Sequence, residues 1–140
     1  MKTQNNIIKE IADSLLCGMI CFYEKATNSF IEYPKEVEDY LMFDEENPWQ
    51  EVIDKVEDNV DDYLLIDPMP SSEAFKLMEQ FAREIDSLGF SAKLLDALDK
   101  RKPFQNFNHL IENDFDNRQL WFDFRLEKNM EWVKRQIEFG

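Results

Sequence analysis

Cysteine and histidine are scarce in this chain of 140 residues, which has two cysteines and one histidine. Two cysteines are too few for a disulfide framework. If the segment holding Cys17 and Cys21 is extended, their Cα atoms lie about 13 Å apart, whereas a disulfide needs about 4.4–6.8 Å. A zinc site would need more ligands than these thiols and His109 supply. We therefore predict that both cysteines are small buried hydrophobic residues, with a reactive thiol at Cys17 as the less favoured alternative.

Glycine is equally rare, and phosphate-binding loops depend on it. The three glycines stand far apart, at positions 18, 89 and 140, so no glycine-rich loop can surround a phosphate group. No serine or threonine stands in the sequence context of a nucleophile elbow, and His109 is expected to be a partly exposed residue without a catalytic role. The sequence therefore predicts no cofactor and favours a protein that is not an enzyme.

Long hydrophobic runs are also missing. The longest apolar run covers residues 15–23, nine residues, whereas a membrane-spanning helix needs about 20. Glu10 and Asp13 precede this run and no small-residue cleavage site follows it, which excludes a signal peptide there. We therefore expect a cytoplasmic protein that does not enter a membrane.

Positive charge is nearly absent from the first half of the chain, where Arg83 is the first arginine to appear. Residues 1–70 hold 17 acidic residues and five lysines, a net charge of −12, whereas residues 71–140 hold 13 acidic and 11 basic residues, a net charge of −2. Within residues 36–67, 13 acidic residues face Lys55 alone. Such a charge repels phosphate backbones and anionic lipid and favours a basic partner. Solubility is the simpler explanation of the same pattern.

Material for a hydrophobic core is plentiful despite this charge. Hydrophobic residues make up 44% of the chain and aromatic residues 14%, with 12 Phe and 3 Trp. Disordered acidic segments are poor in aromatic residues, so the charge is carried by a folded protein. The length suits one domain of ordinary size, and we predict a single compact domain over residues 1–140.

The hydrophobic periodicity predicts a small antiparallel sheet of about three strands, at residues 19–24, 29–33 and 63–66, with a turn at 26–29. A helix precedes it, with an apolar stripe over residues 7–15, an N-cap at Asn5 or Asn6, and an end near Gly18. Another helix follows Pro48 and Trp49, with Val52, Ile53 and Val56 as its docking stripe.

The second half of the chain is predicted to be mainly helical. Ser71 is expected to cap a helix whose core stripe includes Phe75, Met78, Phe81 and Ile85, and Ser91 to open the next helix after an interruption at Gly89. Pro103 ends that helix and starts another. Asn117 is the expected cap of a last helix reaching residue 139, although residues 120–126 also alternate like a strand. The fold class is therefore α+β, with the sheet covered by five or six helices.

Two acidic clusters resemble metal sites but lack the spacing of one. Asp44, Glu45 and Glu46 form the first cluster, and Asp58, Asp61 and Asp62 form the second. Neither has the alternating ligands, the glycine and the terminal Glu of a calcium loop. We interpret both, together with Trp49, as a solvated acidic surface for a partner protein. A weak divalent-ion site is the less favoured alternative.

One basic cluster, Lys100, Arg101 and Lys102, precedes Pro103 and the aromatic residues Phe104 and Phe107. Cations interleaved with aromatic rings can bind single-stranded nucleic acid. The stronger interpretation is structural, because Phe104 and Phe107 have the spacing of buried helix residues and cations stabilise a helix C-terminus. We therefore expect both rings to be mostly buried.

The block at residues 16–23, Leu-Cys-Gly-Met-Ile-Cys-Phe-Tyr, resembles a family of small bacterial proteins known only as an uncharacterised protein family. The likeness continues in four later blocks: Glu73-Ala74-Phe75 with Met78, Glu79, Phe81 and Ala82; Arg101-Lys102-Pro103-Phe104 with Phe107; Trp121-Phe122 with Phe124; and Trp132. The resemblance implies a shared fold and a bacterial cytoplasmic setting, and it carries over no catalytic residue.

Three functions follow from these patterns. The leading hypothesis is a non-enzymatic interaction or regulatory protein that binds a basic protein through Asp44, Glu45, Glu46, Trp49, Asp58, Asp61 and Asp62, with Arg101 and Lys102 as further candidate contacts. The alternatives are nucleic-acid binding through residues 100–107, and an enzyme that uses carboxylates alone or with a divalent metal ion.

Overall fold

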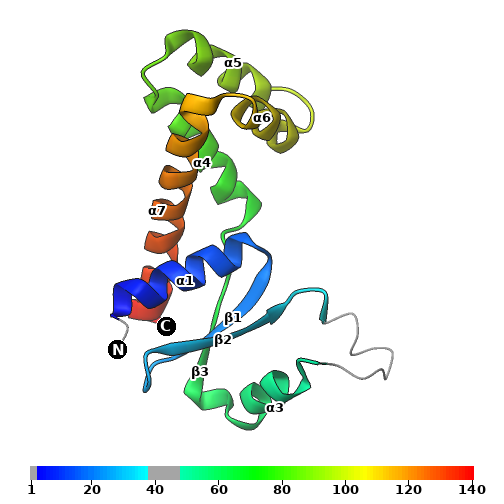
Figure 1. Ribbon diagram of the computed structural model, residues 1–140, viewed down its shortest axis with the longest axis vertical. Helices are drawn as coiled ribbons and strands as arrows, with labels where there is room; N and C mark the ends of the chain where they lie inside the picture. The colour runs from blue at the N-terminus through cyan, green and yellow to red at the C-terminus, as the bar shows by residue number, and fades with distance from the viewer. Residues whose placement is uncertain (1–2, 38–47) are drawn as a thin grey trace. The chain divides into compact units, whose positions relative to one another are not determined.

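Residues 3–37 and 48–140 are described by the computed structural model of the chain, which falls into two units (Figure 1). The first, called here the sheet unit, comprises residues 1–68 and 129–140. The second, the helical unit, comprises residues 69–128. Helix α7 (Phe115–Phe139) contributes to both units. That residues 1–140 form one compact domain stays a prediction.

The sheet unit is built on three antiparallel strands in the described part of the chain: β1 (Met19–Glu24), β2 (Ser29–Pro34) and β3 (Tyr63–Ile66). Their order is β2-β1-β3. In this register Phe22 lies opposite Ile31 on one side and Leu65 on the other. The predicted strands and the α+β class are confirmed, with β2 starting at the last residue of the predicted turn. Asn28 adopts a left-handed conformation with φ 49° in that turn, and its side-chain oxygen accepts a hydrogen bond from the Tyr23 hydroxyl at 3.1 Å.

Helix α1 (Gln4–Leu16) buries the predicted apolar stripe against the sheet unit's core. The predicted cap at Asn5 or Asn6 is wrong, because the helix begins earlier. Thr3 is the N-cap, and its hydroxyl oxygen accepts a hydrogen bond from the Asn6 amide at 3.2 Å. The helix ends as predicted before Gly18, whose φ of +84° lets the chain turn into β1 at little steric cost.

The core of the sheet unit is mainly aliphatic. Its buried residues include Ile7, Ile8, Ile11, Ala12, Leu15, Cys21, Tyr23, Val37, Ile53, Ile66, Val133 and Ile137. Helix α3 (Gln50–Asp58) contributes Ile53, with Val52 and Val56 half-buried beside it, which confirms the predicted docking stripe. A short 3-10 helix, η1 (Val60–Asp62), then leads into β3.

The helical unit contains α4 (Ser71–Glu84), α5 (Leu88–Leu98), α6 (Pro103–Glu112) and the first half of α7. Its core is a cluster of aromatic rings. The Phe81 ring lies edge-on to Trp121 with 5.3 Å between centroids, and Phe107 lies edge-on to Trp121 at 4.9 Å. On α4, Met78 and Phe81 are buried as predicted, whereas Phe75 and Ile85 are half-buried at the margin of this cluster.

Three predicted helix starts in the helical unit are wrong, by one residue for α4 and by three for α5, while α7 is described below. Ser71 is the first residue of α4, and Pro70 holds the N-cap position. Helix α5 begins at Leu88 with Ser87 as its cap, so Gly89 lies inside the helix. The Ser91 hydroxyl instead donates a hydrogen bond to the Ala82 carbonyl.

Helix α7 begins at Phe115 rather than after the predicted cap Asn117. The Asp114 carboxylate accepts a hydrogen bond from the Asn117 amide at 3.0 Å and so caps the helix. Residues 118–126 are helical, which settles the ambiguity of the alternating pattern. The burial along α7 fits this outcome, because Asn129, Val133 and Ile137 follow at four-residue steps and Trp121 lies eight residues before Asn129, which is helical rather than alternating spacing. Within the described residues, no helix combines the length and the apolar character that crossing a membrane requires.

Candidate functional site

A strongly acidic surface of the sheet unit lies on α3 and η1. Six acidic side chains there are exposed, and we call them the acidic face: Glu51, Asp54, Glu57, Asp58, Asp61 and Asp62. Lys55 is the one cation between residues 50 and 62. The structure therefore brings three predicted contact residues, Asp58, Asp61 and Asp62, onto consecutive helical turns beside three further carboxylates.

Local structure explains why these carboxylates are exposed. Helix α3 docks through Ile53, with Val52 and Val56 half-buried beside it, so its acidic positions face solvent. Trp49, also a predicted contact residue, is half-buried at the N-cap position of α3. At the other end, the Asn59 side chain donates a hydrogen bond to the Lys55 carbonyl at 2.8 Å, which closes the helix before η1. The acidic face is thus held by the buried anchor Ile53 and by the hydrogen bond that Asn59 makes at the end of α3.

The other predicted contact residues lie elsewhere. Asp44, Glu45 and Glu46 fall outside the residues that the structure describes. Arg101 and Lys102 belong to the helical unit, where they are exposed in the connection between α5 and α6.

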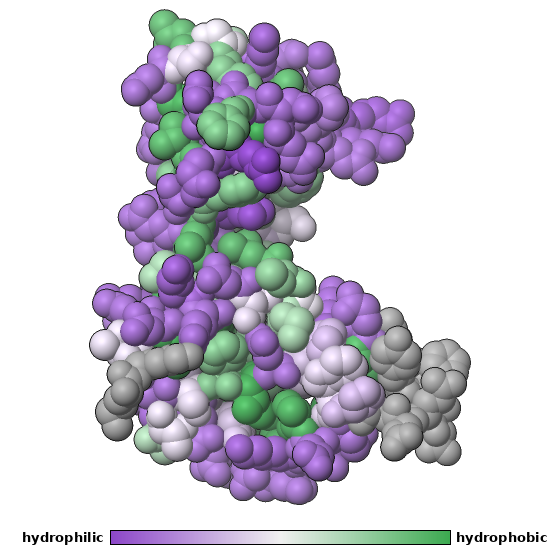
Figure 2. Space-filling model, in the orientation of Figure 1, coloured by the Kyte–Doolittle hydropathy of each residue, from purple (hydrophilic) through white to green (hydrophobic). Residues whose placement is uncertain are grey.

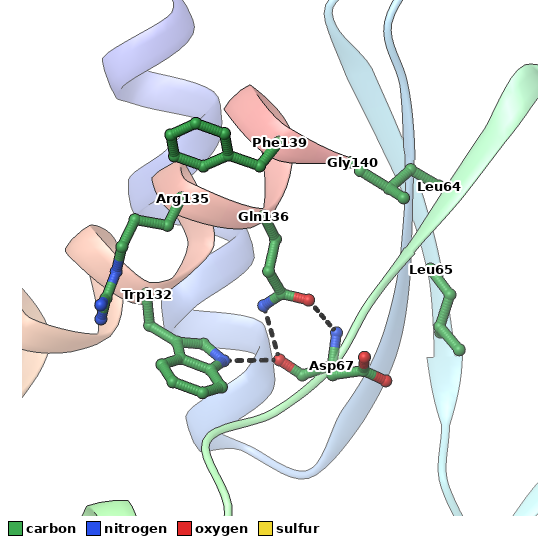
Figure 3. Close-up of a pocket in the computed structure, with 8 residues that line it drawn as sticks. All are labelled: Leu64, Leu65, Asp67, Trp132, Arg135, Gln136, Phe139 and Gly140. Atoms are coloured by element: carbon green, nitrogen blue, oxygen red, sulfur yellow. Dashed lines mark hydrogen bonds between the residues drawn. The ribbon is translucent and has the colours of Figure 1, made fainter.

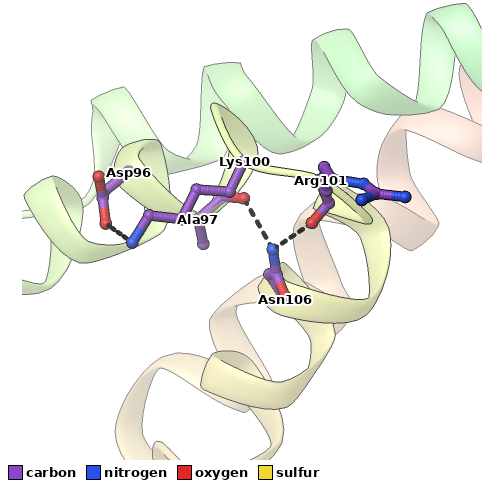
Figure 4. Close-up of polar contacts among 5 residues, drawn as sticks. All are labelled: Asp96, Ala97, Lys100, Arg101 and Asn106. Atoms are coloured by element: carbon purple, nitrogen blue, oxygen red, sulfur yellow. Dashed lines mark hydrogen bonds and ion pairs between the residues drawn. The ribbon is translucent and has the colours of Figure 1, made fainter.

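The connection between α5 and α6 is a tightly hydrogen-bonded corner (Figure 4). The Asn106 side chain donates to the Arg101 carbonyl at 2.8 Å and to the Ala97 carbonyl at 3.3 Å. Lys102 adopts a left-handed conformation with φ 57°, immediately before Pro103 at the first position of α6. The Lys100 ammonium lies 2.8 Å from Asp96, and this hydrogen bond raises the pKa of Lys100.

The aromatic residues that follow this corner belong to the helical core. Phe107 is fully buried, which confirms its prediction. Phe104 is half-buried and lies edge-on to Phe75, with 6.3 Å between ring centroids. The interleaving of cations and rings in the sequence therefore has a structural explanation, because the rings pack inward while Arg101 and Lys102 stay in solvent.

The two thiols have different environments and are both free, so the prediction that they do not pair is confirmed. Cys21 is buried in β1, and burial, with a smaller effect of Glu32, raises the pKa of its thiol to about 12. The predicted burial of Cys17 is wrong, because it follows the last turn of α1 on the exposed side of the chain. His109 is exposed on α6. In the described residues no three His, Cys, Asp or Glu side chains gather as a metal site would require.

A groove beside the outer edge of β3 was not predicted from the sequence (Figure 3). Its volume is about 450 Å³, and β3 and the last turns of α7 line it with Leu64, Leu65, Asp67, Trp132, Arg135, Gln136, Phe139 and Gly140. Three hydrogen bonds hold the two segments together at Asp67. Its carbonyl accepts from the Trp132 indole and from the Gln136 side chain, each at 2.9 Å, and its amide donates to Gln136 at 2.8 Å. The one sequence signal was Phe139, a large apolar residue at the end of α7, which the structure leaves exposed.

A second hollow of about 410 Å³ lies over one face of the same sheet. Its apolar lining includes Ile20, Phe22, Tyr33 and Leu65, and the Phe22 and Tyr33 rings stack with centroids 6.1 Å apart. Figure 2 shows apolar side chains at the surface of the sheet unit between hydrophilic ones. Leu65 therefore lines both the groove at the edge and the hollow on the face.

The fold and these surfaces define a small acidic α+β protein with an exposed carboxylate surface and an open sheet edge. The chain belongs to the Uncharacterised protein family (UPF0158), which it matches over residues 25–139. The resemblance predicted from the sequence is confirmed, although the block at residues 16–23 precedes the matched range.

A relative is UPF0158 protein PA5073 of Pseudomonas aeruginosa, 32% identical over 98 residues. The aligned residues make up 70% of this chain and 64% of the relative, so the match spans somewhat less than two thirds of the relative's length. No solved structure matches the chain. The acidic face, β3 and the last turns of α7 all lie within the range matched to the family.

Proposed function

We propose that this protein is a non-enzymatic, cytoplasmic interaction protein that binds a basic protein through the acidic face of α3 and η1. The observation that carries the proposal is the exposure of six carboxylates beside a single lysine on two consecutive helical segments. Such a surface concentrates negative potential, which attracts a basic partner and speeds its association.

Relief of repulsion between neighbouring carboxylates would favour the binding of a basic partner. Carboxylates one helical turn apart, such as Asp54 with Asp58, repel one another and slightly destabilise α3. Lysine or arginine side chains of a partner would remove that repulsion and form charge-assisted hydrogen bonds. Because exposed charges are screened over about 8 Å at physiological ionic strength, this binding should weaken strongly as salt is added. The same potential disfavours nucleic acid and anionic lipid at this surface.

The two alternative functions stay predictions without a supporting observation. Nucleic-acid binding through residues 100–107 would need accessible rings, whereas Phe107 is buried and Phe104 packs on Phe75. An enzyme using carboxylates and a metal ion would need converging ligands, and the described residues offer no such group.

The proposal is tested by capturing partners from a bacterial lysate across a salt series. The test variant neutralises four residues of the acidic face: E57Q, D58N, D61N and D62N. The matched control neutralises four exposed acidic residues of the helical unit: D86N, D99N, E112Q and E127Q. Both variants change the net charge equally. A difference in binding between them therefore depends on where the removed charges lie and not on how many were removed.

We expect a basic protein to be retained at low salt by the unaltered protein and by the control, and to be lost from the acidic-face variant. Equal loss from both variants would mean that net charge alone attracts the partner. Failure to retain any basic protein at low salt would contradict the proposal outright.

A further inference from the structure

We infer that the outer edge of β3 is a docking site for an extended peptide segment of the basic partner, which adds to the sheet beside β3. This inference rests on the proposed function and specifies how the partner binds. It places the contact next to the acidic face, because β3 directly follows η1 in the chain.

The edge of β3 is open to a further strand. In the sheet order β2-β1-β3, one side of β3 pairs with β1, and the other side pairs with no strand in the described parts of the chain. An unpaired edge presents main-chain N–H and C=O groups that can accept another chain. Addition of a peptide to such an edge is a common mode of peptide recognition.

The hydrogen bonds at Asp67 show which main-chain groups point outward. Both its N–H and its C=O bond to the Gln136 side chain, which lies on the α7 side (Figure 3). This exchange of two bonds is the pattern that a residue of a neighbouring antiparallel strand would make. Because backbone groups alternate in direction along extended chain, the N–H and C=O of Leu65 point to the same side. The side chain of Gln136 therefore makes the hydrogen bonds to Asp67 that a residue of an added strand would make. Leu65, two residues before Asp67, is the next position at which an added strand could pair.

The groove provides room and apolar contact for the added segment. Leu65 is 46% exposed and Phe139 is 85% exposed, so two large apolar side chains among the lining residues lack cover. In the sheet register Leu65 lies opposite Phe22, so both side chains share one face. A partner residue opposite Leu65 would place its side chain on that face, where an apolar group would gain a cross-strand contact.

Charge selects the kind of segment that fits. Asp61 and Asp62 precede β3 and Asp67 follows it, so an added segment meets carboxylates near both of its ends. Arg135, whose guanidinium lies 5.5 Å from the Trp132 ring centroid, is the one cation among the residues that line the groove. The matching segment has an apolar centre between basic ends. A second copy of β3 does not match, because antiparallel pairing would bring acidic residues of the two copies together.

The experiment uses the whole protein and a synthetic peptide, Lys-Lys-Val-Thr-Val-Lys-Lys, at low salt. Binding is followed by titration and by hydrogen exchange of the Leu65 amide. A second peptide is N-methylated on its central amides, which keeps its charge and apolar groups but removes main-chain donors. We expect the first peptide to slow exchange at Leu65 by about tenfold and the second to bind about five- to tenfold more weakly, the effect of one or two lost hydrogen bonds.

Two variants of equal charge separate strand addition from simple attraction. Leu65→Lys places a lysine on the edge, a substitution that natural edge strands use to prevent pairing. Val60→Lys adds the same charge on η1, where Val60 is 66% exposed. We expect Leu65→Lys to lose the peptide and Val60→Lys to weaken its binding only about two- to threefold, as expected for an exposed charge.

Several outcomes would overturn the inference. Equal binding of the two peptides with no change at the Leu65 amide would exclude strand addition, and so would equal loss from both lysine variants. No binding of the first peptide at concentrations up to about 1 mM would exclude it as well. None of these outcomes decides the proposed function, because retention of a basic protein by the acidic face is measured without this peptide.

Discussion

The two units of the molecule differ in both core and charge. The helical unit is built around interlocking aromatic rings, of which Phe81, Phe107 and Trp121 are buried, whereas the core of the sheet unit is mostly aliphatic. The sheet unit carries 19 acidic and seven basic residues, and the helical unit 11 and nine. The helical unit therefore has a nearly neutral surface around a dense core, and the sheet unit carries almost all of the net charge.

The arrangement of charge differs as much as its amount. In the helical unit acidic and basic residues pair along the helices, as Lys76 does with Glu73 and Lys100 with Asp96. Such exposed pairs add little stability but cancel the local potential. On α3 and η1, six carboxylates have Lys55 as the one cation in the segment. This difference is the basis of our proposal that the sheet unit, rather than the helical unit, carries the binding surface.

The largest predicted effect is in the aromatic core. Phe81 is 4% exposed and contacts Phe107, Trp121 and Phe124. Phe81→Ala removes these contacts and leaves a cavity, so we expect the free energy of unfolding to fall by about 3–5 kcal/mol. Chemical denaturation measures the loss. Phe115→Ala is the control, because Phe115 is 91% exposed and its loss should change stability by less than about 0.5 kcal/mol.

The same variant tests whether the two units unfold together. Trp121 reports on the helical unit, whereas Trp49 and Trp132 report on the sheet unit. If residues 1–140 form the predicted single domain, Phe81→Ala should shift the midpoint equally for single-tryptophan proteins that keep Trp121 or Trp132. A shift confined to the Trp121 protein would show two independent units.

A smaller effect is expected at the α5–α6 corner. Because Phe104 is half-buried, Phe104→Ala should cost about 1–2 kcal/mol, roughly half of the transfer and cavity cost of a fully buried Phe. Replacing Lys100, Arg101 and Lys102 with Gln should change stability by less than about 1 kcal/mol, since these cations are exposed. If Phe104→Ala left the stability unchanged while the replacement of the three cations lowered it, the interpretation that the rings support the fold and the cations do not would be contradicted.

The hydrogen bonds that join the end of β3 to α7 should contribute less still to the free energy of unfolding. Gln136→Ala removes two hydrogen bonds to Asp67, which should cost about 1 kcal/mol after water replaces part of them. Gln119→Ala is the matched control on the same helix, because Gln119 bonds only to Asp123 one turn away and should contribute a few tenths of a kcal/mol. Equal effects would show that Gln136 does not hold β3 and α7 together.

The two cysteines should differ in their reactivity toward a thiol reagent, and the effect on stability at neutral pH should be the smallest of those predicted. A thiol reagent at neutral pH should label Cys17, which is exposed, and leave Cys21 unlabelled until the protein unfolds. Burial raises the pKa of Cys21 from 9.0 to about 12, so the folded state disfavours its thiolate. The unfolded thiol ionises first, and stability should therefore fall as pH rises from 9 towards 12, less so in Cys21→Ala. Fast labelling of both thiols in the folded protein would contradict the placement of Cys21.

Most of the secondary structure could be predicted, because it depends on short-range periodicity. The strands at residues 19–24 and 63–66 and the helix anchored by Ile53 follow from apolar spacing within one segment. Helix starts were less predictable. Ser71, Ser91 and Asn117 are all residue types that cap helices. Ser87 and Asp114 lie a few residues before Ser91 and Asn117, suit the cap position equally well by residue type, and are the ones that cap α5 and α7. The choice depends on how each helix packs, as the hydrogen bond from Ser91 to Ala82 shows.

The sequence by itself determined the α+β class, the family and the concentration of acidic residues before β3, because these depend on composition and local pattern. Only the tertiary structure decided that Gln136 pairs with Asp67, 69 residues earlier in the chain, and that no strand of the described residues pairs with the outer edge of β3 at Leu65. It likewise decided that Phe107 is fully buried, whereas Phe104, expected from its spacing to be mostly buried, is half-buried against Phe75. The reason is physical: local preferences act over a few residues, whereas strand edges and grooves form where distant segments meet.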